Sequence, residues 1–297
     1  MRAVTTRYSH RDRLGIDWGA RLERFEDDLV ASKTLTEFAR HTARLLAAAK
    51  DKHIHVRVAD MALAGYSRPV TPNVNERTLE GLVPGWAEPN GRVRPGRFDD
   101  GAGYLAIRSW SEGDPRDFDS VFAALEELQG APGLIVDVRL NGGGDELLAR
   151  SVAGCFIDGP RLYATHKGVT DDGGFIESSE RWFGPAPGRA HFAGPVAVLM
   201  GPVCMSCNEA FLLIMRRTPN AKFVGLPSQG SLGNPRRHDL GNGVTVSLPS
   251  WVAMTADGQA FEGVGLAPDI RVDATPEAFE TADPVLDAAL AWLRTGG

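Results

Sequence analysis

Two strand–turn–helix units constrain the fold of this chain more than any other feature. In the first, the strand Gly133–Arg139, with its continuous apolar stretch, leads into Asn141-Gly142-Gly143-Gly144 and then a helical pattern. In the second, the apolar run 195–200 leads through a Gly-Pro turn into a helix that opens near Ser206. Strands that are apolar throughout are typical of a sheet buried on both faces. The repeated arrangement predicts an α/β domain whose site lies at the carboxyl ends of parallel strands.

The patterns around these units divide the chain into three parts. Residues 1–58 show helical apolar spacing and a capping box from Thr34 to Glu37, so we expect a small helical subdomain that ends in a strand. Residues 59–100 are rich in proline and glycine and predict short strands and loops that cover the core. Residues 101–297 hold the α/β core. Its further predicted elements are a strand at 104–108, a helix from 115 to 129 and a hairpin at 239–246.

Composition excludes several classes of protein. The net charge of −6 argues against a nucleic-acid partner, because phosphate binding needs a basic face. No apolar run approaches the roughly 20 residues that a membrane-spanning helix needs, so we expect no membrane partner. The first ten residues carry positive charge with no apolar stretch behind them, which is not a secretory signal. We therefore expect a cytoplasmic protein, unless an export signal was removed from this sequence.

The three cysteines, Cys155, Cys204 and Cys207, are too few for a disulfide framework. Cys204 and Cys207 form a C-x-x-C, but no second pair and no histidine at ligand spacing accompany it. We interpret them as two buried thiols beside a turn and expect no metal and no cofactor.

The two turns could carry chemistry together. Three glycines after a buried strand let backbone N–H groups point outward at a helix start, where the helix dipole adds positive character. A serine at a helix N-terminus, such as Ser206, is most often a helix cap. If the two strands are neighbours, however, the Ser206 hydroxyl and the glycine N–H groups converge as a nucleophile and an oxyanion hole.

Several stretches, in order along the chain, resemble the C-terminal processing peptidases, the family of the tail-specific proteases and the tricorn core. Gly133–Gly144 resembles the family's "L-I-D-L-R-x-N-x-G-G" strand and turn. Pro195–Glu209 resembles its nucleophile segment, in which the serine stands three residues before a glutamate, as Ser206 does before Glu209. Three further stretches match: the closing "E-G-x-G-x-x-P-D-I" at Phe261–Ile270, the helical entry Ile16-Asp17-Trp18, and the D-x-H pattern Asp51-Lys52-His53.

The resemblance implies an α/β core of the Clp protease/crotonase-like type, with the small N-terminal helical subdomain packed over the site. Many members insert a PDZ domain before the core, but the stretch between His53 and Gly101 is too short for one. The implied activity is that of a serine hydrolase, in the first place a peptidase that acts on a peptide or on a small amide or ester through an acyl-enzyme.

The resemblance also implies roles for individual residues. Ser206 is the nucleophile, and the N–H of Cys207 with that of either Gly143 or Gly144 forms the oxyanion hole. Many tail-specific members use a lysine as base, but Ser231 stands at that position, so no Ser–Lys dyad can form there. The tricorn-like alternative is a histidine base with a late glutamate. The residues that match it are His53 and Glu262, although Lys52 replaces the serine that precedes the histidine in tricorn-type sites.

Two other histidines remain as alternative bases. His55 lies two residues from His53 and would point the same way on a strand, and His238 follows two arginines near Ser231. Alternatives to a peptidase also stay open: an acyl transferase or cyclase that uses the same serine, or a non-catalytic ligand-binding member of the fold. A crotonase-type thioester enzyme is less consistent with Ser206 and the closing motif. Assembly into a homo-oligomer is left open.

Overall fold

The computed structural model describes residues 1–86, 93–111 and 118–296, which divide into two compact units. Unit 1 consists of Met1–Pro69, Thr165–Glu180 and Ser231–Gly263. Unit 2 consists of Val70–Ala164, Arg181–Gly230 and Val264–Gly297. The predicted division into 1–58, 59–100 and 101–297 follows the order of the sequence and stays a prediction.

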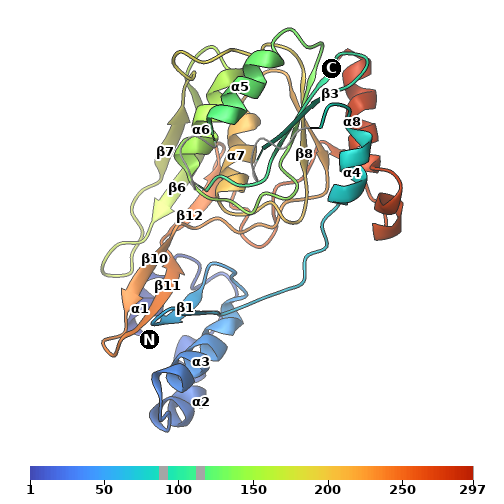
Figure 1. The fold of residues 1–297 in the computed structure, drawn as a ribbon. Helices are drawn as coiled ribbons and strands as arrows, with labels where there is room; N and C mark the ends of the chain where they lie inside the picture. The colour runs from blue at the N-terminus through green and yellow to red at the C-terminus, as the bar shows by residue number, and fades with distance from the viewer. Residues whose placement is uncertain (87–92, 112–117, 297) are drawn as a thin grey trace. The chain divides into compact units, whose positions relative to one another are not determined.

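Unit 2 is built on a six-stranded sheet of order β13-β9-β8-β5-β4-β3 (Figure 1). Its strands are parallel except β3, which pairs antiparallel with β4 at the edge. Every residue of β4, β5 and β8 is buried, as their continuous apolar runs predict. The strands are β3 (Val93–Arg97), β4 (Gly103–Ile107), β5 (Leu134–Asp137), β8 (Val196–Met200), β9 (Ala221–Gly225) and β13 (Ile270–Arg271).

Helices cover both faces of this sheet, with α4 and α8 on one side and α5, α6 and α7 on the other in Figure 1. The mixed α/β fold with two strand–turn–helix units is therefore confirmed. The predicted helix at 115–129 is observed as α5 from Asp119, and its predicted start lies outside the described residues. The helices are α4 (Glu76–Leu82), α5 (Asp119–Glu127), α6 (Glu146–Ala153), α7 (Cys207–Met215) and α8 (Pro284–Arg294), with short 3₁₀ turns η3 (Gly154–Phe156) and η4 (Pro276–Glu280).

A buried ionic cluster fixes the end of β5 against α8. The Arg139 guanidinium is fully buried and binds the carboxylates of Asp137 and Asp283 at 2.7 and 2.8 Å. Asp283 also caps α8 by accepting the first N–H groups of the helix, and the Tyr104 hydroxyl donates to Asp137 at 2.8 Å. Both carboxylates are thus fully engaged, which a buried charge requires. The cluster anchors the segment that leads into the glycine turn.

Unit 1 combines helices with an antiparallel sheet of order β10-β11-β1-β2. Thr34 caps α3 by accepting the Glu37 N–H at 3.1 Å, as predicted, while the Glu37 carboxylate accepts the N–H of Lys33. The predicted helices, strand and hairpin are all present. The elements are α1 (Arg2–Arg7), α2 (Trp18–Val30), α3 (Leu35–Leu46), η1 (Ala47–Ala49), β1 (His55–Val58), β2 (Met61–Ala64), β10 (Pro235–Asp239) and β11 (Val244–Pro249).

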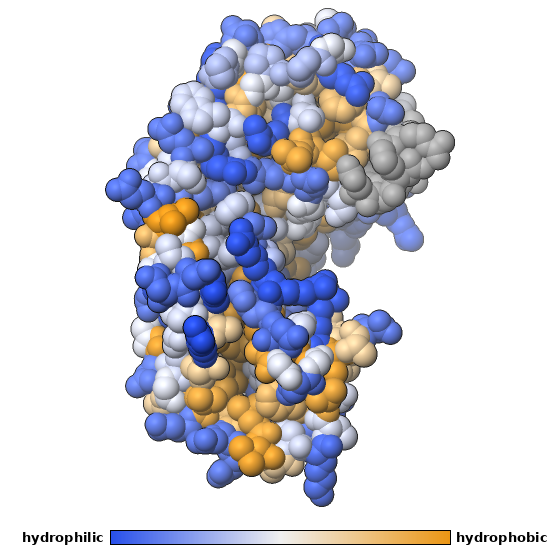
Figure 2. Space-filling view, turned by 90° about the vertical axis from the view of Figure 1, so that its left-hand side faces the viewer, coloured by the Kyte–Doolittle hydropathy of each residue, from blue (hydrophilic) through white to orange (hydrophobic). Residues whose placement is uncertain are grey.

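A third sheet, of order β12-β6-β7, contains β6 (Arg161–Gly168), β7 (Ser179–Phe183) and β12 (Trp251–Thr255). In the described part of the chain, none of the helices has both the length and the apolar character that crossing a membrane requires. On the face shown in Figure 2, hydrophobic residues gather at the lower end of the view, where Figure 1 places α2 and α3. Val30 and Leu35, which flank the turn between these helices, are 81% and 47% exposed.

Candidate active site

Ser206 has an unusual backbone conformation at the start of α7. It occupies the helix-cap position, but its φ is 56° and its ψ is −133°, and its side chain makes no capping hydrogen bond. A serine at this position commonly caps the helix with its side chain, but Ser206 does not. A non-glycine residue in such a conformation costs about 1–3 kcal/mol and persists only where its surroundings enforce it. The half-buried Ser206 hydroxyl therefore binds none of the first N–H groups of α7.

The glycine turn lies directly against Ser206. Strands β5 and β8 are parallel neighbours, with Asp137 opposite Leu199, so the segments that follow them leave the same edge of the sheet. A Cβ atom added to Gly143 would lie 2.8 Å from the Cβ of Ser206 and 3.1 Å from the backbone N of Cys207. Only a residue without a side chain allows this approach. The predicted convergence of the two turns is confirmed.

The N–H groups around Ser206 are not equivalent. The Gly143 N–H donates to Asn141 Oδ1 at 2.9 Å and is already engaged. For the N–H groups of Gly144 and Cys207, no acceptor is found within the described residues. The Cys207 N–H belongs to the first residue of α7, at the positive end of the helix dipole. These two donors are therefore available to an oxyanion, whereas Gly143 is not.

The side chains of Trp110 and Asn208 are fully buried and connect α7 with the glycine turn. The sequence patterns did not single them out. Asn208 Nδ2 donates to the carbonyl oxygens of Val138 and Asn141 at 3.1 and 3.0 Å. Asn208 Oδ1 accepts the indole N–H of Trp110 at 3.0 Å. Asn208 could not be identified from the sequence, because an asparagine within a helical pattern resembles any exposed polar position.

Glu209, three residues after Ser206, is fully buried on α7. Its Oε1 accepts hydrogen bonds from the Ser228 hydroxyl and the Gly230 N–H, both at 2.6 Å. The Ser228 hydroxyl in turn accepts the Leu266 N–H at 2.8 Å. Glu209 therefore holds the segment 228–230 on α7.

The predicted histidine base belongs to unit 1. His53 lies in a turn before β1, not on the strand, and is 7% exposed. Its Nδ1 is 2.9 Å from the hydroxyl oxygen of Ser231 and 3.8 Å from Asp51 Oδ1, which also accepts the His53 N–H. For Nε2, no hydrogen-bond partner is present among the residues that the structure describes. Burial lowers the pKa of His53, and the nearby Asp51 carboxylate partly offsets this effect.

The predicted partner of His53, Glu262, lies in a neighbouring carboxylate cluster. Glu262 Oε2 accepts the Leu232 N–H at 3.0 Å and is 3.6 Å from His10 Nε2. Asp51, His10 and Glu262 each offer one ligand atom within 4.8 Å of the others, a donor set that suits a divalent transition metal. Protein donors already bind both carboxylates, since the Tyr8 hydroxyl donates to Asp51 at 3.0 Å. We therefore assign no metal to this cluster.

The two alternative histidines, His55 and His238, also belong to unit 1. His55 opens β1, and its Nδ1 lies 3.2 Å from the His53 carbonyl oxygen. Because His53 precedes the strand, the expectation that both histidines lie on one strand is wrong. His238 lies half-buried on β10, where burial, followed by Arg7 and Arg236, lowers its pKa. All three cysteines are buried and free, and burial was predicted for Cys204 and Cys207.

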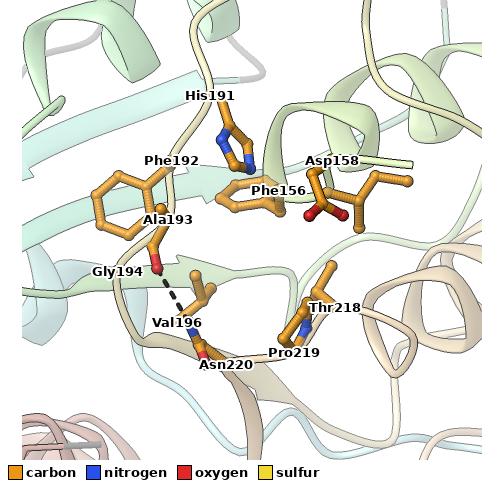
Figure 3. A pocket seen from close by; sticks show the side chains of 11 residues that line it. Phe156, Asp158, His191, Phe192, Ala193, Gly194, Val196, Thr218, Pro219 and Asn220 are labelled. Atoms are coloured by element: carbon orange, nitrogen blue, oxygen red, sulfur yellow. Dashed lines mark hydrogen bonds between the residues drawn. The ribbon is translucent and has the colours of Figure 1, made fainter.

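Unit 2 also contains a cavity of about 170 Å³ at the amino-terminal end of β8 (Figure 3). Phe156, Phe192 and His191 surround it, and Asn220 donates to the Ala193 carbonyl across one edge. Ser206 follows the opposite, carboxyl end of β8. None of the predicted site residues lines this cavity.

The chain is similar to proteins of a known family and to several solved structures. Residues 101–272, more than half of the chain, match the model of "Peptidase family S41". The carboxy-terminal processing protease CtpA of Bacillus subtilis (strain 168) is 24% identical over 179 residues, 59% of this chain and 36% of the relative. The carboxy-terminal-processing protease of Bartonella bacilliformis is 24% identical over 197 residues, 64% of this chain and 43% of the relative. The matches thus span well under half the length of these curated relatives.

Two solved structures share the fold. A proposed peptidase from Parabacteroides merdae ATCC 43184 superposes with a TM-score of 0.86 at 23% identity, covering 100% of this chain and 95% of the other. Mature CPAF complexed with lactacystin superposes with a TM-score of 0.74 at 12% identity, covering 99% and 95%. At these identities the likeness concerns the fold alone. Together with the family match over residues 101–272, it leads to one conclusion: the chain belongs to peptidase family S41.

Proposed function

We propose that this chain is a serine peptidase that cleaves peptide bonds through an acyl-enzyme on Ser206. One observation carries the proposal: Ser206 is held in a strained, left-handed backbone at the start of α7, in contact with a glycine turn. Strain of this kind clusters at active sites, where the fold enforces it. Membership of peptidase family S41 supports the same conclusion.

The oxyanion hole in this proposal consists of the N–H groups of Cys207 and Gly144. The choice of Gly144 over Gly143 rests on Asn141, whose side chain already accepts the Gly143 N–H. Two backbone donors that are fixed before the reaction stabilise the developing negative charge at no cost in reorganisation. Removing one such donor typically lowers kcat by about 10²–10³-fold.

His53 acts as the general base for Ser206. In this proposal His53 Nδ1 carries the hydrogen and donates it to the hydroxyl oxygen of Ser231, at the position of the missing lysine, which leaves Nε2 as the nitrogen that accepts a proton. The lowered pKa keeps the imidazole neutral at pH 7, as a base requires. The carboxylates of Asp51 and Glu262 then stabilise the imidazolium that forms, in the role that an aspartate has in other serine hydrolases.

The reaction follows from these roles. The Ser206 oxygen attacks the carbonyl carbon of the scissile bond while His53 takes its proton, and the two N–H groups bind the oxyanion. His53 then donates the proton to the leaving amine, and the ester on Ser206 remains. Water attacks the ester by the same route and releases the new carboxyl terminus. A bound amine in place of water would make the same chain a transferase or cyclase.

A peptide-cleavage assay in H₂¹⁸O tests this function. The purified chain is incubated with a defined mixture of peptides, and the products are analysed by mass spectrometry. We expect cleavage that places one ¹⁸O atom in each new carboxyl terminus, that is lost in Ser206→Ala and that is strongly reduced in His53→Gln. Ser32→Ala, which alters a partly exposed serine far from Ser206 in the sequence, serves as the matched control.

The other outcomes separate the alternatives. Products joined to an amine, without ¹⁸O, would indicate an acyl transferase or cyclase. No cleavage by native protein, together with tight retention of a peptide, would support the non-catalytic binding protein. Cleavage that persists in Ser206→Ala would refute the proposed nucleophile.

A further inference from the structure

The two N–H groups of the proposed oxyanion hole come from different segments of unit 2. Gly144 belongs to the turn after β5, whereas Cys207 opens α7 after β8. An oxyanion hole requires both donors within about 2.7–3.1 Å of one developing charge. The pairing of β5 with β8 brings the two segments together, and contacts beyond the edge of the sheet then hold them to each other.

Trp110 is bound to the glycine turn through its backbone. Its N–H donates to the Gly143 carbonyl at 3.0 Å, and its carbonyl accepts the Asp145 N–H at 2.8 Å. A Cβ added to Gly144 would lie only 2.2 Å from the carbonyl carbon of Trp110. The backbone of Trp110 thus follows the turn closely on both sides of Gly144.

The side chain of Trp110 reaches the nucleophile helix. Its indole N–H donates to Asn208 Oδ1 at 3.0 Å, and its ring lies 4.6 Å from that of Phe211, also on α7. Asn208 returns two hydrogen bonds to the strand and turn, at Val138 and Asn141. Trp110 and Asn208 are both fully buried, so water does not compete for these bonds.

We propose that Trp110 and Asn208 are positioning residues that set the distance between the Gly144 and Cys207 N–H groups. This inference rests on the proposed function and goes beyond it, because neither residue touches the reacting atoms. The hydrogen bond between the Trp110 indole and the Asn208 amide connects the glycine turn to α7, next to Cys207. Without this hydrogen bond the turn still packs on α7, but the distance between the Gly144 and Cys207 N–H groups is no longer fixed.

The test is the kinetics of Ser206 labelling by a dye-linked fluorophosphonate, which forms a bond to the serine oxygen with loss of fluoride. The amplitude of labelling counts folded sites, and the rate constant reports how reactive each site is. Trp110→Phe keeps an aromatic ring for packing, but removes the indole N–H donor together with part of the ring volume, as the control Trp18→Phe does at its own site. We expect full amplitude and a rate constant lower by about tenfold or more, because misplaced reacting groups lose rate steeply.

A second variant and a control complete the design. Asn208→Ala should lower the rate constant at least as much, because it also removes the bonds to Val138 and Asn141. The double variant should lose little more than Asn208→Ala alone, because the indole–amide bond is already absent there. Trp18→Phe, which removes the indole hydrogen bond of another buried tryptophan to the Arg11 carbonyl, should label at the native rate.

The results separate a positioning role from a structural one. A native rate constant in Trp110→Phe and Asn208→Ala, at any amplitude, would overturn the inference while leaving the proposed function intact. A native chain that is not labelled at all would overturn the proposed function, and this inference with it.

Discussion

Gly143→Ala is the substitution that the geometry around Ser206 penalises most clearly. The φ of Gly143 is 116°, a conformation that costs a residue with a side chain about 1–2 kcal/mol. The new methyl group would also lie 2.8 Å from the Cβ of Ser206 and 3.1 Å from the N of Cys207, neither of which is the end of a flexible side chain. Overpacking of this kind costs about 1–3 kcal/mol.

The two effects together amount to about 3 kcal/mol. For a domain of about 150–250 residues, each kcal/mol lowers Tm by about 2–4 °C, so the expected fall is about 6–12 °C. If Gly143→Ala remains folded, the turn can relieve the overlap only by moving away from Ser206. We therefore expect a loss of fluorophosphonate labelling rate of at least about 10²-fold, the effect of losing an oxyanion donor.

Gly142→Ala is the matched control one residue earlier. A Cβ at Gly142 meets no atom within 4 Å, and its φ is not positive. The free energy of unfolding of this variant should stay within about 1 kcal/mol of the native value, and its labelling rate should equal the native rate. Both properties are measured by thermal unfolding and by a labelling time course. Gly143→Ala with the Tm and labelling rate of Gly142→Ala would refute the reasoning.

Buried titratable side chains lead to three further predictions. The labelling rate should fall with decreasing pH around a midpoint below 6.5, since burial lowers the pKa of His53 and protonation removes the base; a midpoint at or above 7 would contradict this. Burial lowers the pKa of His10 from 6.5 to about 4, so the unfolding free energy should fall by about 3 kcal/mol as pH decreases from 6.5 to 4, relative to His10→Gln. The sign follows because the unfolded chain binds this proton and the folded chain does not. Asp283→Ala should cost about 3–5 kcal/mol in urea unfolding, because it leaves a buried guanidinium half-paired. Asp273→Ala, which removes the exposed partner of Arg271, should leave the urea midpoint close to the native value.

The sequence predicted the strand–turn–helix units because their signals are local. A continuous apolar run followed by glycines determines a buried strand and its turn, and the parallel pairing of β5 with β8 then brings Gly143 to Ser206. The strained backbone of Ser206 could not be predicted in this way. It depends on contacts between two segments that are more than 60 residues apart in the sequence.

The partners of the site residues were harder to predict than the residues themselves. Ser231 was recognised as the position of a missing lysine, but its bond to His53 depends on where the turn at 51–54 places the imidazole ring. His10, which the sequence analysis did not connect with the site, lies buried beside Glu262. The roles proposed for His53 and Glu262, and the absence of a PDZ domain, stay predictions.

The most direct test of the central claim is the intact mass of the chain after incubation with a fluorophosphonate, followed by peptide mapping of the adduct. The account predicts one adduct per native chain, mapped to Ser206, no adduct in Ser206→Ala and slow labelling in His53→Ala. An unmodified native chain, or an adduct that maps to another residue and persists in Ser206→Ala, would contradict the claim that Ser206 is an activated nucleophile.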